Sequence, residues 1–365
     1  MRSTTVVEVT GGWANGRDGS AGAAVLVSSV SQGRSACGVG RAVSSCAEVR
    51  YCVRTRSTVG DPGPVVRADF SYRRRQAGCD ARRMILITGA TGTIGSSIVT
   101  QLVADGVPVR AATRDPENAA FPAGVEVVRV DYREPGTITA ALTGIEAAFL
   151  NGLPGPGDTG ADAALVAAAR AAGARRVVKL SAVGTGDPRL GIPGSWHVPG
   201  EDAVRASGLE WTILRPNTFA SNTFSWIQPL ADGAPVPNLT GDGRQAVVDP
   251  RDVAAVAVAA LRDPAHHGRT YTLTGPTLQT GREQAADLAV VLDRPIEVID
   301  IAEPDARAFL TAAGLSPAFV EGALIGQRFI RDGHNAQLSG DVAAVLGRPP
   351  RGYADWAADH RAAFA

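Results

Sequence analysis

A glycine-rich turn at Gly89–Gly95 constrains the fold of this chain more than any other feature. It reads Gly-Ala-Thr-Gly-Thr-Ile-Gly and directly follows the apolar run Met84–Ile87, which predicts a short buried strand. Apolar residues at Ile94, Ile98 and Leu102 then mark one face of a helix. A strand that enters a helix through three glycines at this spacing predicts a dinucleotide-binding βαβ unit.

Each glycine of the turn has its own structural role. Gly89 allows the tight turn, Gly92 lets the backbone approach a pyrophosphate, and Gly95 lets the helix pack close to the strand. The phosphates then meet unpaired N–H groups and the positive end of the helix dipole. The alternative is a tight strand–helix turn that holds no ligand. The predicted cofactor-binding residues of the turn are Gly89, Thr91, Gly92, Thr93, Ile94 and Gly95.

The end of the second predicted strand indicates which dinucleotide is bound. An NAD site places Asp or Glu there for the ribose hydroxyls, whereas this chain has Thr113 and Arg114. Arg114 offers a planar donor fork for a 2′-phosphate and Thr113 can add a hydroxyl, so the sequence predicts NADP(H). The alternative is an exposed surface arginine, or one paired with Asp115. Asp131, after the third strand, is placed either to reach the adenine or to cap the segment that follows.

Predicted strands and helices alternate along most of the remaining chain. Strands are predicted at 107–113, 125–130, 147–150, 177–180, 211–214 and 270–274, and helices at 94–103, 138–142, 162–172, 200–207, 250–261, 282–292, 304–313 and 353–363. Such alternation predicts an α/β fold with right-handed crossovers. We expect a Rossmann-type, doubly wound parallel sheet with a smaller C-terminal substrate lobe, formed mainly from residues 217–245 and 270–365.

Residues 1–83 differ in composition from residues 84–365. They contain 13 Arg against six acidic residues, and they hold all four cysteines. They show no sustained helical or strand period, and cysteine gaps of 9, 6 and 27 residues do not match a zinc site, so no metal is predicted. We expect 1–83 to be disordered, or to be upstream sequence translated by mis-assignment of the start, with Met84 as the natural first residue. Residues 84–365 are then the folded NAD(P)-binding domain.

Charge and hydropathy argue against several classes of function. The formal net charge of zero disfavours a dedicated nucleic-acid or membrane-surface binder. No apolar run is long enough to span a bilayer, and none near the N-terminus has the form of a signal peptide. The sequence therefore predicts a cytoplasmic protein that acts on a small molecule, without direct binding to nucleic acid or membrane.

Several motifs in 84–365 together resemble one known family. They are Gly89–Gly95, Thr113-Arg114, Ser181, Ser207–Asn217, Val248–Val253 and the C-terminal run Tyr353–Arg361. In order and spacing they are similar to the NmrA-like atypical short-chain dehydrogenase/reductases, in their NAD(P)H quinone-reductase-like branch. The resemblance implies a Rossmann domain, NADP(H) binding and a small substrate lobe. Members of the family include NADPH-dependent quinone reductases and non-catalytic redox-sensing regulators.

The Tyr-x-x-x-Lys pair of mainstream short-chain dehydrogenases is absent. None of the five tyrosines has Lys four residues on, and the only lysine, Lys179, lies inside the fifth predicted strand. Ser181 and His197 remain near the expected catalytic site. His titrates near neutral pH, so His197 could act as a general acid, and Ser181 could hydrogen-bond a carbonyl. The alternatives are a loop histidine that caps the next helix or contacts the ribose, and a serine bonded to the backbone.

The segment after the sixth predicted strand is expected to border the substrate. By resemblance, Pro216 and Asn217 line the place of the nicotinamide. The aromatic residues that follow are spaced to wall an apolar pocket, although packing in the core of the small lobe explains any one of them equally well. The predicted substrate-pocket residues are Asn217, Phe219, Asn222, Phe224 and Trp226.

Two functions follow from these observations. The first is an NADPH-dependent reductase that transfers a hydride to a quinone or a similar small conjugated carbonyl, an acceptor that needs little acid assistance because it is electron-poor. The second is a non-catalytic NADP(H)-sensing regulatory protein of the NmrA type. The missing Tyr-x-x-x-Lys pair favours the second. The predicted apolar pocket and the Ser181–His197 pair favour the first, which is our expectation.

Overall fold

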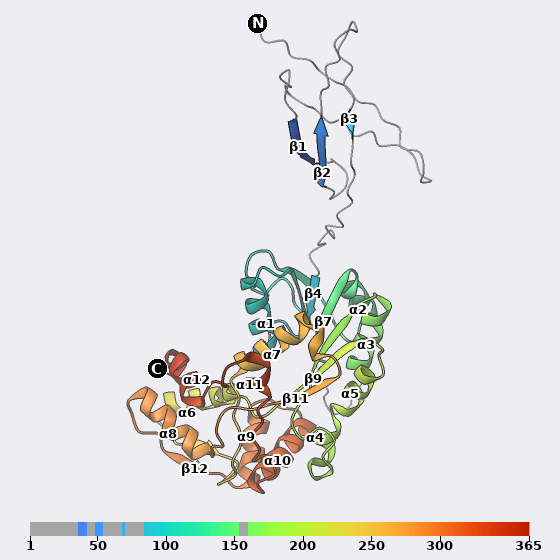
Figure 1. Ribbon diagram of the computed structural model, residues 1–365. Coiled ribbons are helices and arrows are strands. Elements are labelled where there is room, and N and C mark those ends of the chain that lie inside the picture. Colours follow the sequence, from blue (N-terminus) through green and yellow to red (C-terminus); the bar gives the residue numbers. More distant parts are fainter. Residues whose placement is uncertain (1–35, 42–47, 54–67, 70–83, 153–159, 365) are drawn as a thin grey trace, which may run out of the picture. The chain divides into compact units, whose positions relative to one another are not determined.

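The computed structural model describes residues 36–41, 48–53, 68–69, 84–152 and 160–364. Two compact units make up the chain, Met1–Ala81 and Arg82–Ala365 (Figure 1). In the first, β1 (Ala36–Arg41) and β3 (Ala68–Asp69) each pair antiparallel with β2 (Glu48–Val53). The sequence pattern predicts no regular structure here, so these short strands differ from the prediction. The prediction for the rest of 1–83 falls outside the described residues.

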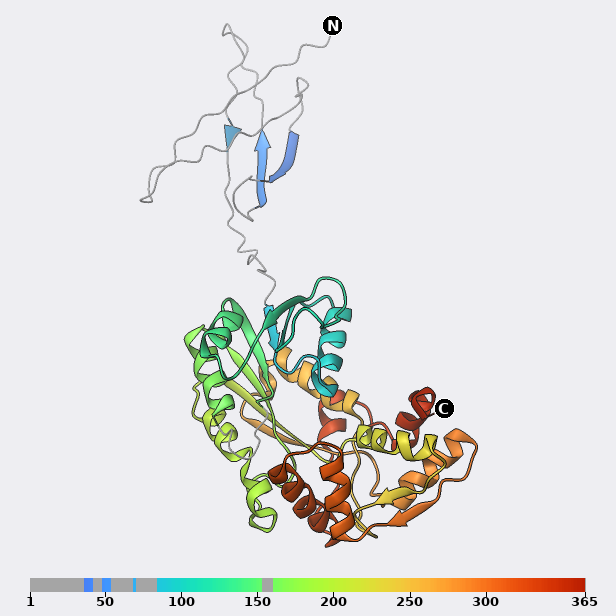
Figure 2. The same ribbon diagram turned by 180° about the vertical axis from the view of Figure 1, so that it is seen from behind.

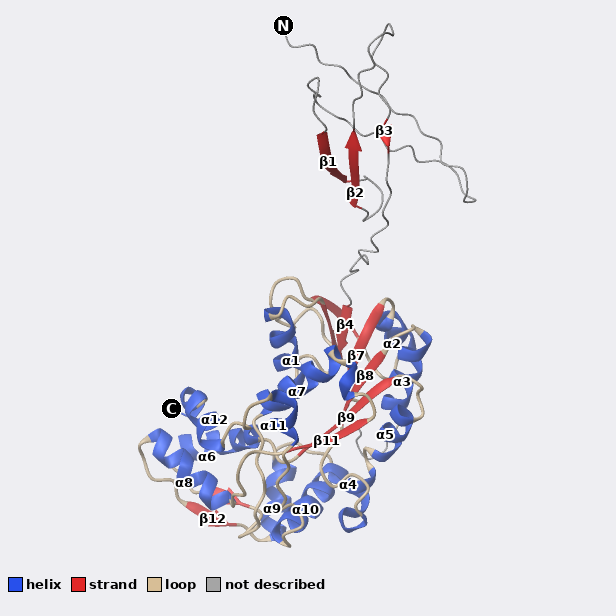
Figure 3. Ribbon diagram, in the orientation of Figure 1, coloured by secondary structure: helices blue, strands red, loops and turns tan. Residues whose placement is uncertain are grey.

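The second unit is built on a seven-stranded sheet, drawn in red in Figure 3. Its strands are β4 (Met84–Ile87), β5 (Val109–Thr113), β6 (Glu126–Arg129), β7 (Ile145–Leu150), β8 (Arg176–Leu180), β9 (Glu210–Pro216) and β11 (Arg269–Leu273). The order across the sheet is β11-β9-β8-β7-β4-β5-β6, and every neighbouring pair is parallel. The strand order reverses between β4 and β7, so the predicted Rossmann-type doubly wound sheet is confirmed.

Helices cover both faces of this sheet. One face carries α1 (Thr93–Ala104), α7 (Pro250–Arg262) and α11 (Asp341–Leu346), and the other carries α2 (Pro135–Leu142), α3 (Ala161–Ala171) and α5 (Val198–Arg205). Figure 2 shows the second set, in shades of green, along one side of the strands. Ile87 and Phe149 belong to one core, and their neighbours Leu86 and Ala148 belong to the other. Because both faces are buried, these strands are continuous apolar runs.

The start of α7 follows from local chemistry. The Asp249 carboxylate accepts a hydrogen bond of 2.8 Å from the backbone N–H of Arg251, and Pro250 occupies the first helical position. An acidic cap followed by proline is a strong helix start. After α7, the 3-10 turn η3 (Pro264–His266) leads into β11, the edge strand of the sheet.

The remaining elements form a smaller lobe. They are η2 (Ala220–Trp226), α6 (Ile227–Ala231), β10 (Val236–Asn238), α8 (Gly281–Leu292), β12 (Val298–Asp300), α9 (Glu303–Ala312), α10 (Pro317–Arg331), α12 (Tyr353–Asp359) and η4 (Arg361–Phe364). Trp226, Leu288 and Trp356 lie in its core. Within the predicted range 270–365, β11 instead joins the main sheet and α11 packs against α7.

Helix α10 is the longest element that the sequence analysis missed. Its buried residues include Val320, Leu324 and Phe329. Val320 and Leu324 share one helical face and one apolar cluster, whereas Phe329 lies on the opposite face. Ser316 accepts a hydrogen bond of 3.4 Å from the N–H of Phe319 and thereby caps the helix, and Pro317 follows the cap. The start signal was therefore present in the sequence.

Candidate active site

The turn between β4 and α1 depends on glycine at two positions. Gly89 has a φ of +61°, a left-handed conformation that glycine adopts without strain. A Cβ on Gly95 would lie 2.2 Å from the carbonyl oxygen of Gly89. The same oxygen would be 3.3 Å from a Cβ on Gly92. The helix can therefore approach the turn this closely only where residue 95 has no side chain.

The turn leaves the N-terminus of α1 open. Thr91, Gly92 and Thr93 are exposed, whereas Ile94 and Gly95 are buried. Among the described residues, no side chain caps α1, and its first turn contains no acidic residue. Its first N–H groups and the positive end of its dipole are therefore available to an anion. This geometry fits the pyrophosphate of a dinucleotide.

The neighbouring strand end contributes a residue that the sequence analysis missed. The Thr88 hydroxyl donates to the carbonyl oxygen of Phe149 at 3.0 Å and accepts from the N–H of Asn151 at 2.7 Å. These bonds join the ends of β4 and β7, where the strand order reverses. The Asn151 Nδ2 lies 2.9 Å from where a Cβ on Gly89 would be. Thr88 directly follows a buried strand, and this position was the signal that the sequence offered.

Arg114, the residue predicted to select the cofactor, lies at the end of a strand of the main sheet. It follows β5, is exposed, and makes no hydrogen bond or ion pair with another described residue. Asp115 accepts instead from the backbone N–H and the Nδ2 of Asn118, at 3.3 and 2.7 Å. The Thr113 hydroxyl accepts from the N–H of Asp115 at 3.3 Å. The alternative of an Arg114–Asp115 pair is therefore not what the structure shows.

Asp131 is engaged in its own turn. Its carboxylate accepts from the backbone N–H of Arg133 at 3.0 Å and lies 3.5 Å from the Arg129 guanidinium. This is the local capping role that the sequence analysis gave as the alternative. An adenine contact by Asp131 stays a prediction.

Lys179, Ser181, His197 and Glu201 form a cluster between β8 and α5, here called the β8–α5 cluster. Lys179 and Ser181 are two positions apart, so their side chains share one face of the sheet. That face is covered by α5, which carries Glu201 and is preceded by His197. Three of the four side chains are buried, and His197 is half-buried.

Ser181 is committed to a buried carboxylate. Its hydroxyl donates to Glu201 Oε1 at 2.6 Å and lies 3.1 Å from the Thr185 hydroxyl. Glu201 also accepts from Arg215 and Arg205 at 2.6 and 2.7 Å. Burial alone would raise the pKa of Glu201, but the hydrogen bonds from Arg215 and Ser181 outweigh it and lower that pKa. Ser181 therefore has no free proton for a substrate carbonyl in this arrangement.

Lys179, set aside as a strand residue in the sequence analysis, is a central group of the cluster. Its side chain is 0% exposed, and its Nζ lies 2.8 Å from the Asp162 carboxylate. The same Nζ donates to the carbonyl oxygen of Leu180 and lies 3.4 Å from His197 Nδ1. A buried ammonium needs such partners because desolvation disfavours its charge. Its pairing with Asp162, from α3, is visible only in the tertiary structure.

His197 does not carry a proton for acid catalysis at neutral pH. Burial, followed by the charge of Lys179, lowers the pKa of His197 from 6.5 to about 3. The basis of its predicted role, titration near neutral pH, is therefore wrong. The neutral ring accepts from Lys179 at Nδ1, which leaves its proton on Nε2 as a hydrogen-bond donor. Its side chain makes no capping bond to α5 either.

The predicted substrate-pocket residues do not wall one cavity. Asn217 is buried, and its carboxamide exchanges hydrogen bonds with that of Asn335 at 2.8 and 3.2 Å. Phe219 packs on the core below α1 and α7. Phe224 contacts Trp356, with ring centroids 5.1 Å apart. Pro216 is buried at the end of β9, Asn222 is exposed, and Trp226 lies in the lobe core.

The aromatic residues of this set do not line a pocket, and the cause is local. The 3-10 turn η2 directs Phe224 and Trp226 toward α12 and η4. The alternative given by the sequence analysis, core packing of the lobe, therefore holds for Trp226, whereas Phe224 packs against Trp356 and Phe364 but stays exposed. For Asn217, the partner comes from a loop more than a hundred residues away, which no local pattern indicates.

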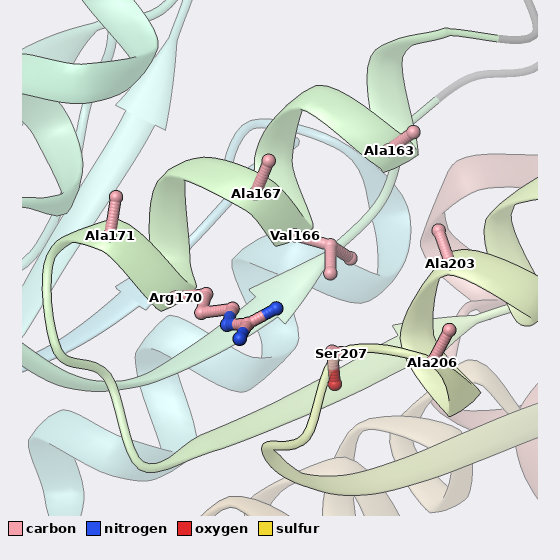
Figure 4. Close-up of a pocket in the computed structure, with 8 residues that line it drawn as sticks. All are labelled: Ala163, Val166, Ala167, Arg170, Ala171, Ala203, Ala206 and Ser207. Atoms are coloured by element: carbon pink, nitrogen blue, oxygen red, sulfur yellow. The ribbon is translucent and has the colours of Figure 1, made fainter.

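One hollow of the described structure is lined by residues outside the predicted site. A cavity of about 500 Å³ lies between α3 and α5 and is lined mainly by alanines (Figure 4). Its polar side chains are Arg170 and Ser207, and no predicted site residue faces it. Among the described residues, no cluster of His, Cys, Asp or Glu could hold a metal ion. None of the helices in the described ranges has the length and apolar character of a membrane span.

Comparisons with known proteins agree with this geometry. A family model described as NAD(P)H-binding matches residues 89–264. The (4-alkanoyl-5-oxo-2,5-dihydrofuran-3-yl)methyl phosphate reductase of Streptomyces griseus is 42% identical, over 77% of this chain and 99% of its own length. The NAD(P)H azoreductase of Xenophilus azovorans is 32% identical, over 77% of this chain and 99% of its own length.

Solved structures extend the comparison. The NADPH-dependent quinone oxidoreductase of Escherichia coli, in complex with NADPH, has a TM-score of 0.66 at 26% identity and covers 76% of this chain and 99% of its own. NmrA, a negative transcriptional regulator, has a TM-score of 0.62 at 16% identity over 76% of this chain and 95% of its own, a likeness of fold alone. The chain belongs to the NAD(P)H-binding family, among Rossmann-type proteins that include NmrA-like proteins and NADPH-dependent quinone reductases.

Proposed function

We propose that this chain is an NADPH-dependent reductase that transfers a hydride to a small, electron-poor conjugated acceptor, a quinone or an unsaturated carbonyl compound. The observation that carries the proposal is the open N-terminus of α1. There Gly95 packs against Gly89 and no described side chain occupies the anion position. Such a turn at the point where the strand order reverses holds the pyrophosphate, and the bound nicotinamide supplies the hydride.

Arg114 supports NADPH as the preferred nucleotide. Its guanidinium is exposed and unpaired among the described residues, so binding a 2′-phosphate costs it no existing ion pair. A guanidinium can grip a phosphate with two parallel hydrogen bonds. NADH lacks this phosphate, and we therefore propose that Arg114 discriminates between the two nucleotides.

The β8–α5 cluster supports an acceptor that needs little acid. His197 is neutral and offers at most an Nε2–H hydrogen bond, and the Ser181 proton is held by Glu201. This chain therefore provides a donor for a polarised oxygen rather than a strong general acid. Reduction of an electron-poor acceptor fits that provision because its carbonyl oxygen, or the corresponding heteroatom, accommodates the electrons and takes its proton from water.

The names of the relatives support the same class of acceptor. The Streptomyces griseus relative is named for a dihydrofuranone that bears an alkanoyl group, a ring in which a double bond is conjugated with carbonyls. The Xenophilus azovorans relative is named for azo compounds, and quinone oxidoreductase 2 of Escherichia coli is named for quinones. All three are electron-poor π systems that accept a hydride. We further propose that residues 84–365 carry the activity, because these relatives match about this part of the chain.

The test is NADPH oxidation followed by absorbance with a panel of quinones, azo dyes and unsaturated lactones. We expect turnover with at least one conjugated acceptor and none with saturated ketones. Intact NADPH binding without turnover of any acceptor would refute the reductase. It would favour the NmrA-type regulator, which at present rests on likeness of fold and on the missing Tyr-x-x-x-Lys pair.

A further inference from the structure

A second cavity, of about 350 Å³, lies between the segment after β8 and the end of α10. Its first wall is η1 (Pro188–Leu190) with the start of α4 (Gly191–Ser195), and its second wall is formed by Ile325 through His334. The volume is in the range of small-molecule sites. None of the residues that line it was a predicted site residue.

Two connections tie this cavity to the strand ends that border the site. On one side, Gly184 follows Ser181 by three residues, and a Cβ on it would lie 2.4 Å from Leu190 Cδ1 and 3.9 Å from Phe329 Cε1. On the other side, His334 directly precedes Asn335, whose amide pairs with Asn217 at the end of β9. The cavity is thus held at the carboxyl ends of β8 and β9, the edge where ligands of such sheets bind.

The walls of the cavity combine an apolar floor with polar sides that are rich in hydrogen-bond donors. Leu190 and Phe329 are buried, and both line the cavity. The polar side chains of the lining are two arginines and a histidine, Arg189, Arg328 and His334, together with one carboxylate, Asp332. This arrangement matches an amphiphilic organic anion, with its apolar part on the floor and its charge at the side.

Asp187 holds Arg189 in position, but one nitrogen of the guanidinium makes no bond to this carboxylate. Its Nε and Nη2 donate to Asp187 at 3.0 and 2.6 Å, and its Cζ lies 5.7 Å from the centre of the Phe329 ring. The hydrogen bonds from Arg189 lower the pKa of Asp187 to about 2, so this anchor is ionised at neutral pH. The remaining Nη1 lies 3.2 Å from His334 Nδ1.

We propose that this cavity binds the anionic group, a phosphate monoester, of the conjugated substrate, with Arg189 Nη1 and His334 as hydrogen-bond donors. The inference rests on the proposed function, because the cavity is taken as part of the same site. The guanidinium and the imidazole come from different elements and meet at one spot. Once an anion enters, Nη1 can donate to one phosphate oxygen and the imidazole to another, through whichever ring nitrogen carries its proton, and charge-assisted bonds of this kind are strong. Arg328 lines the cavity as well, but its guanidinium is already paired with Glu303 at 2.7 Å.

The first experiment compares paired acceptors in steady-state NADPH oxidation. The pair is 1,2-naphthoquinone and its 4-sulfonate, and the variants are Arg189→Leu and His334→Ala. The control is Arg282→Leu, an arginine of similar exposure that pairs with Asp300 at 2.6 Å and lies outside the cavity. For Arg189→Leu we expect KM for the sulfonate to rise roughly 10-fold or more. The kcat and the KM for the neutral quinone should stay nearly constant.

The second experiment needs no turnover. Phenyl phosphate, inorganic phosphate and phenol are titrated into the NADPH complex by calorimetry. We expect phenyl phosphate to bind to the wild type and to the Arg282→Leu control, and to bind much more weakly to Arg189→Leu and His334→Ala. Inorganic phosphate should bind less tightly than phenyl phosphate, because it does not use the apolar floor.

The outcomes separate this inference from the proposed function. Binding of phenyl phosphate that depends on Arg189, together with no reduction of any acceptor, would support an anion site while refuting the reductase. Equal losses for both quinones in Arg189→Leu, or no binding of phenyl phosphate to the wild type, would overturn the inference and leave the reductase standing. Equal affinity for inorganic phosphate would identify a simple anion site and refute recognition of an organic phosphate.

Discussion

The turn at Gly89–Gly95 and the β8–α5 cluster lie at the same edge of one sheet, but they are built from different material. The turn consists of backbone groups from one continuous segment, and it leaves the N-terminus of α1 open. The cluster consists of side chains from β8 and α5, which are largely satisfied by one another and by partners on α3 and β9. The cofactor end is therefore prepared to receive an anion, whereas the other end is already internally paired.

This difference indicates which of the two regions, the turn or the cluster, has groups free to bind a ligand. An internally paired cluster fixes the positions of α5 and of the strand ends, and it offers a ligand few free groups. An open helix N-terminus has unsatisfied donors that a ligand completes. The cluster therefore reads as a support for the site, and His197 is its one member that also reaches the surface. Four predictions test this contrast.

Gly95→Ala should have the largest effect. Its Cβ would meet the backbone of Gly89 at 2.2 Å, so the turn must move and the N–H groups of α1 lose their alignment. We expect NADPH binding, measured by calorimetry, to be lost. Gly136→Ala is the matched control, since a Cβ on this glycine of α2 meets nothing within 4 Å. Near-normal NADPH affinity in Gly95→Ala would contradict the turn as the binding site.

Lys179→Met should mainly reduce stability. It leaves the Asp162 carboxylate buried without its 2.8 Å partner, and loss of one member of a buried ion pair costs about 3–5 kcal/mol. Urea unfolding measures the change. The double variant Lys179→Met with Asp162→Leu should recover part of the loss, although Asp162 also accepts from the N–H of Gly152. A cost below roughly 1 kcal/mol would show that the cluster is not a structural support.

Arg114→Ala should weaken NADPH binding without affecting NADH. Loss of a charge-assisted contact of about 1.5–3 kcal/mol corresponds to roughly 10-fold to 100-fold in affinity. Arg269→Ala, an exposed arginine on the edge strand at the other side of the sheet, serves as control. Fluorescence titration with both nucleotides checks the difference. Equal losses for NADPH and NADH would refute the assignment to the 2′-phosphate.

His197 should make stability depend on acid pH. Its pKa is lowered from 6.5 to about 3 in the fold, so the unfolded chain binds the extra proton between these values. The contribution of His197 is complete above pH 6.5 and decreases as the pH falls toward 3, by up to about 1.4 kcal/mol per pH unit. The wild type should therefore lose stability more steeply over this window than His197→Asn in urea unfolding series. Parallel slopes would mean that His197 is not buried against Lys179.

Much of the fold was predictable because its signals are local. The glycine turn, the alternation of apolar strands and amphipathic helices, and the Asp249-Pro250 helix start each depend on residues a few positions apart. Helix α10 was missed although Ser316 and Pro317 mark its start. The position of Arg114 at a strand end was predictable for the same reason, since it directly follows a run that reads as a buried strand.

Most of the polar site was not predictable, because its partners are distant in sequence. Lys179 meets Asp162 only because α3 packs on β8, and it lowers the pKa of His197 only because α5 covers the same face. Phe224 and Trp226 were placed in a pocket, whereas η2 turns Trp226 into the lobe core and leaves Phe224 exposed against Trp356. Asn217 faces Asn335, 118 residues further along the chain.

The sequence by itself determined the nucleotide-binding turn, the doubly wound sheet and the exposed arginine beside it, since local geometry dictates how neighbouring residues meet. Only the tertiary structure decided the protonation of His197, the commitment of Ser181 to Glu201 and the cavity beside Arg189. Those properties depend on burial and on charges that packing brings together from separate elements, and neither quantity exists until the chain is folded.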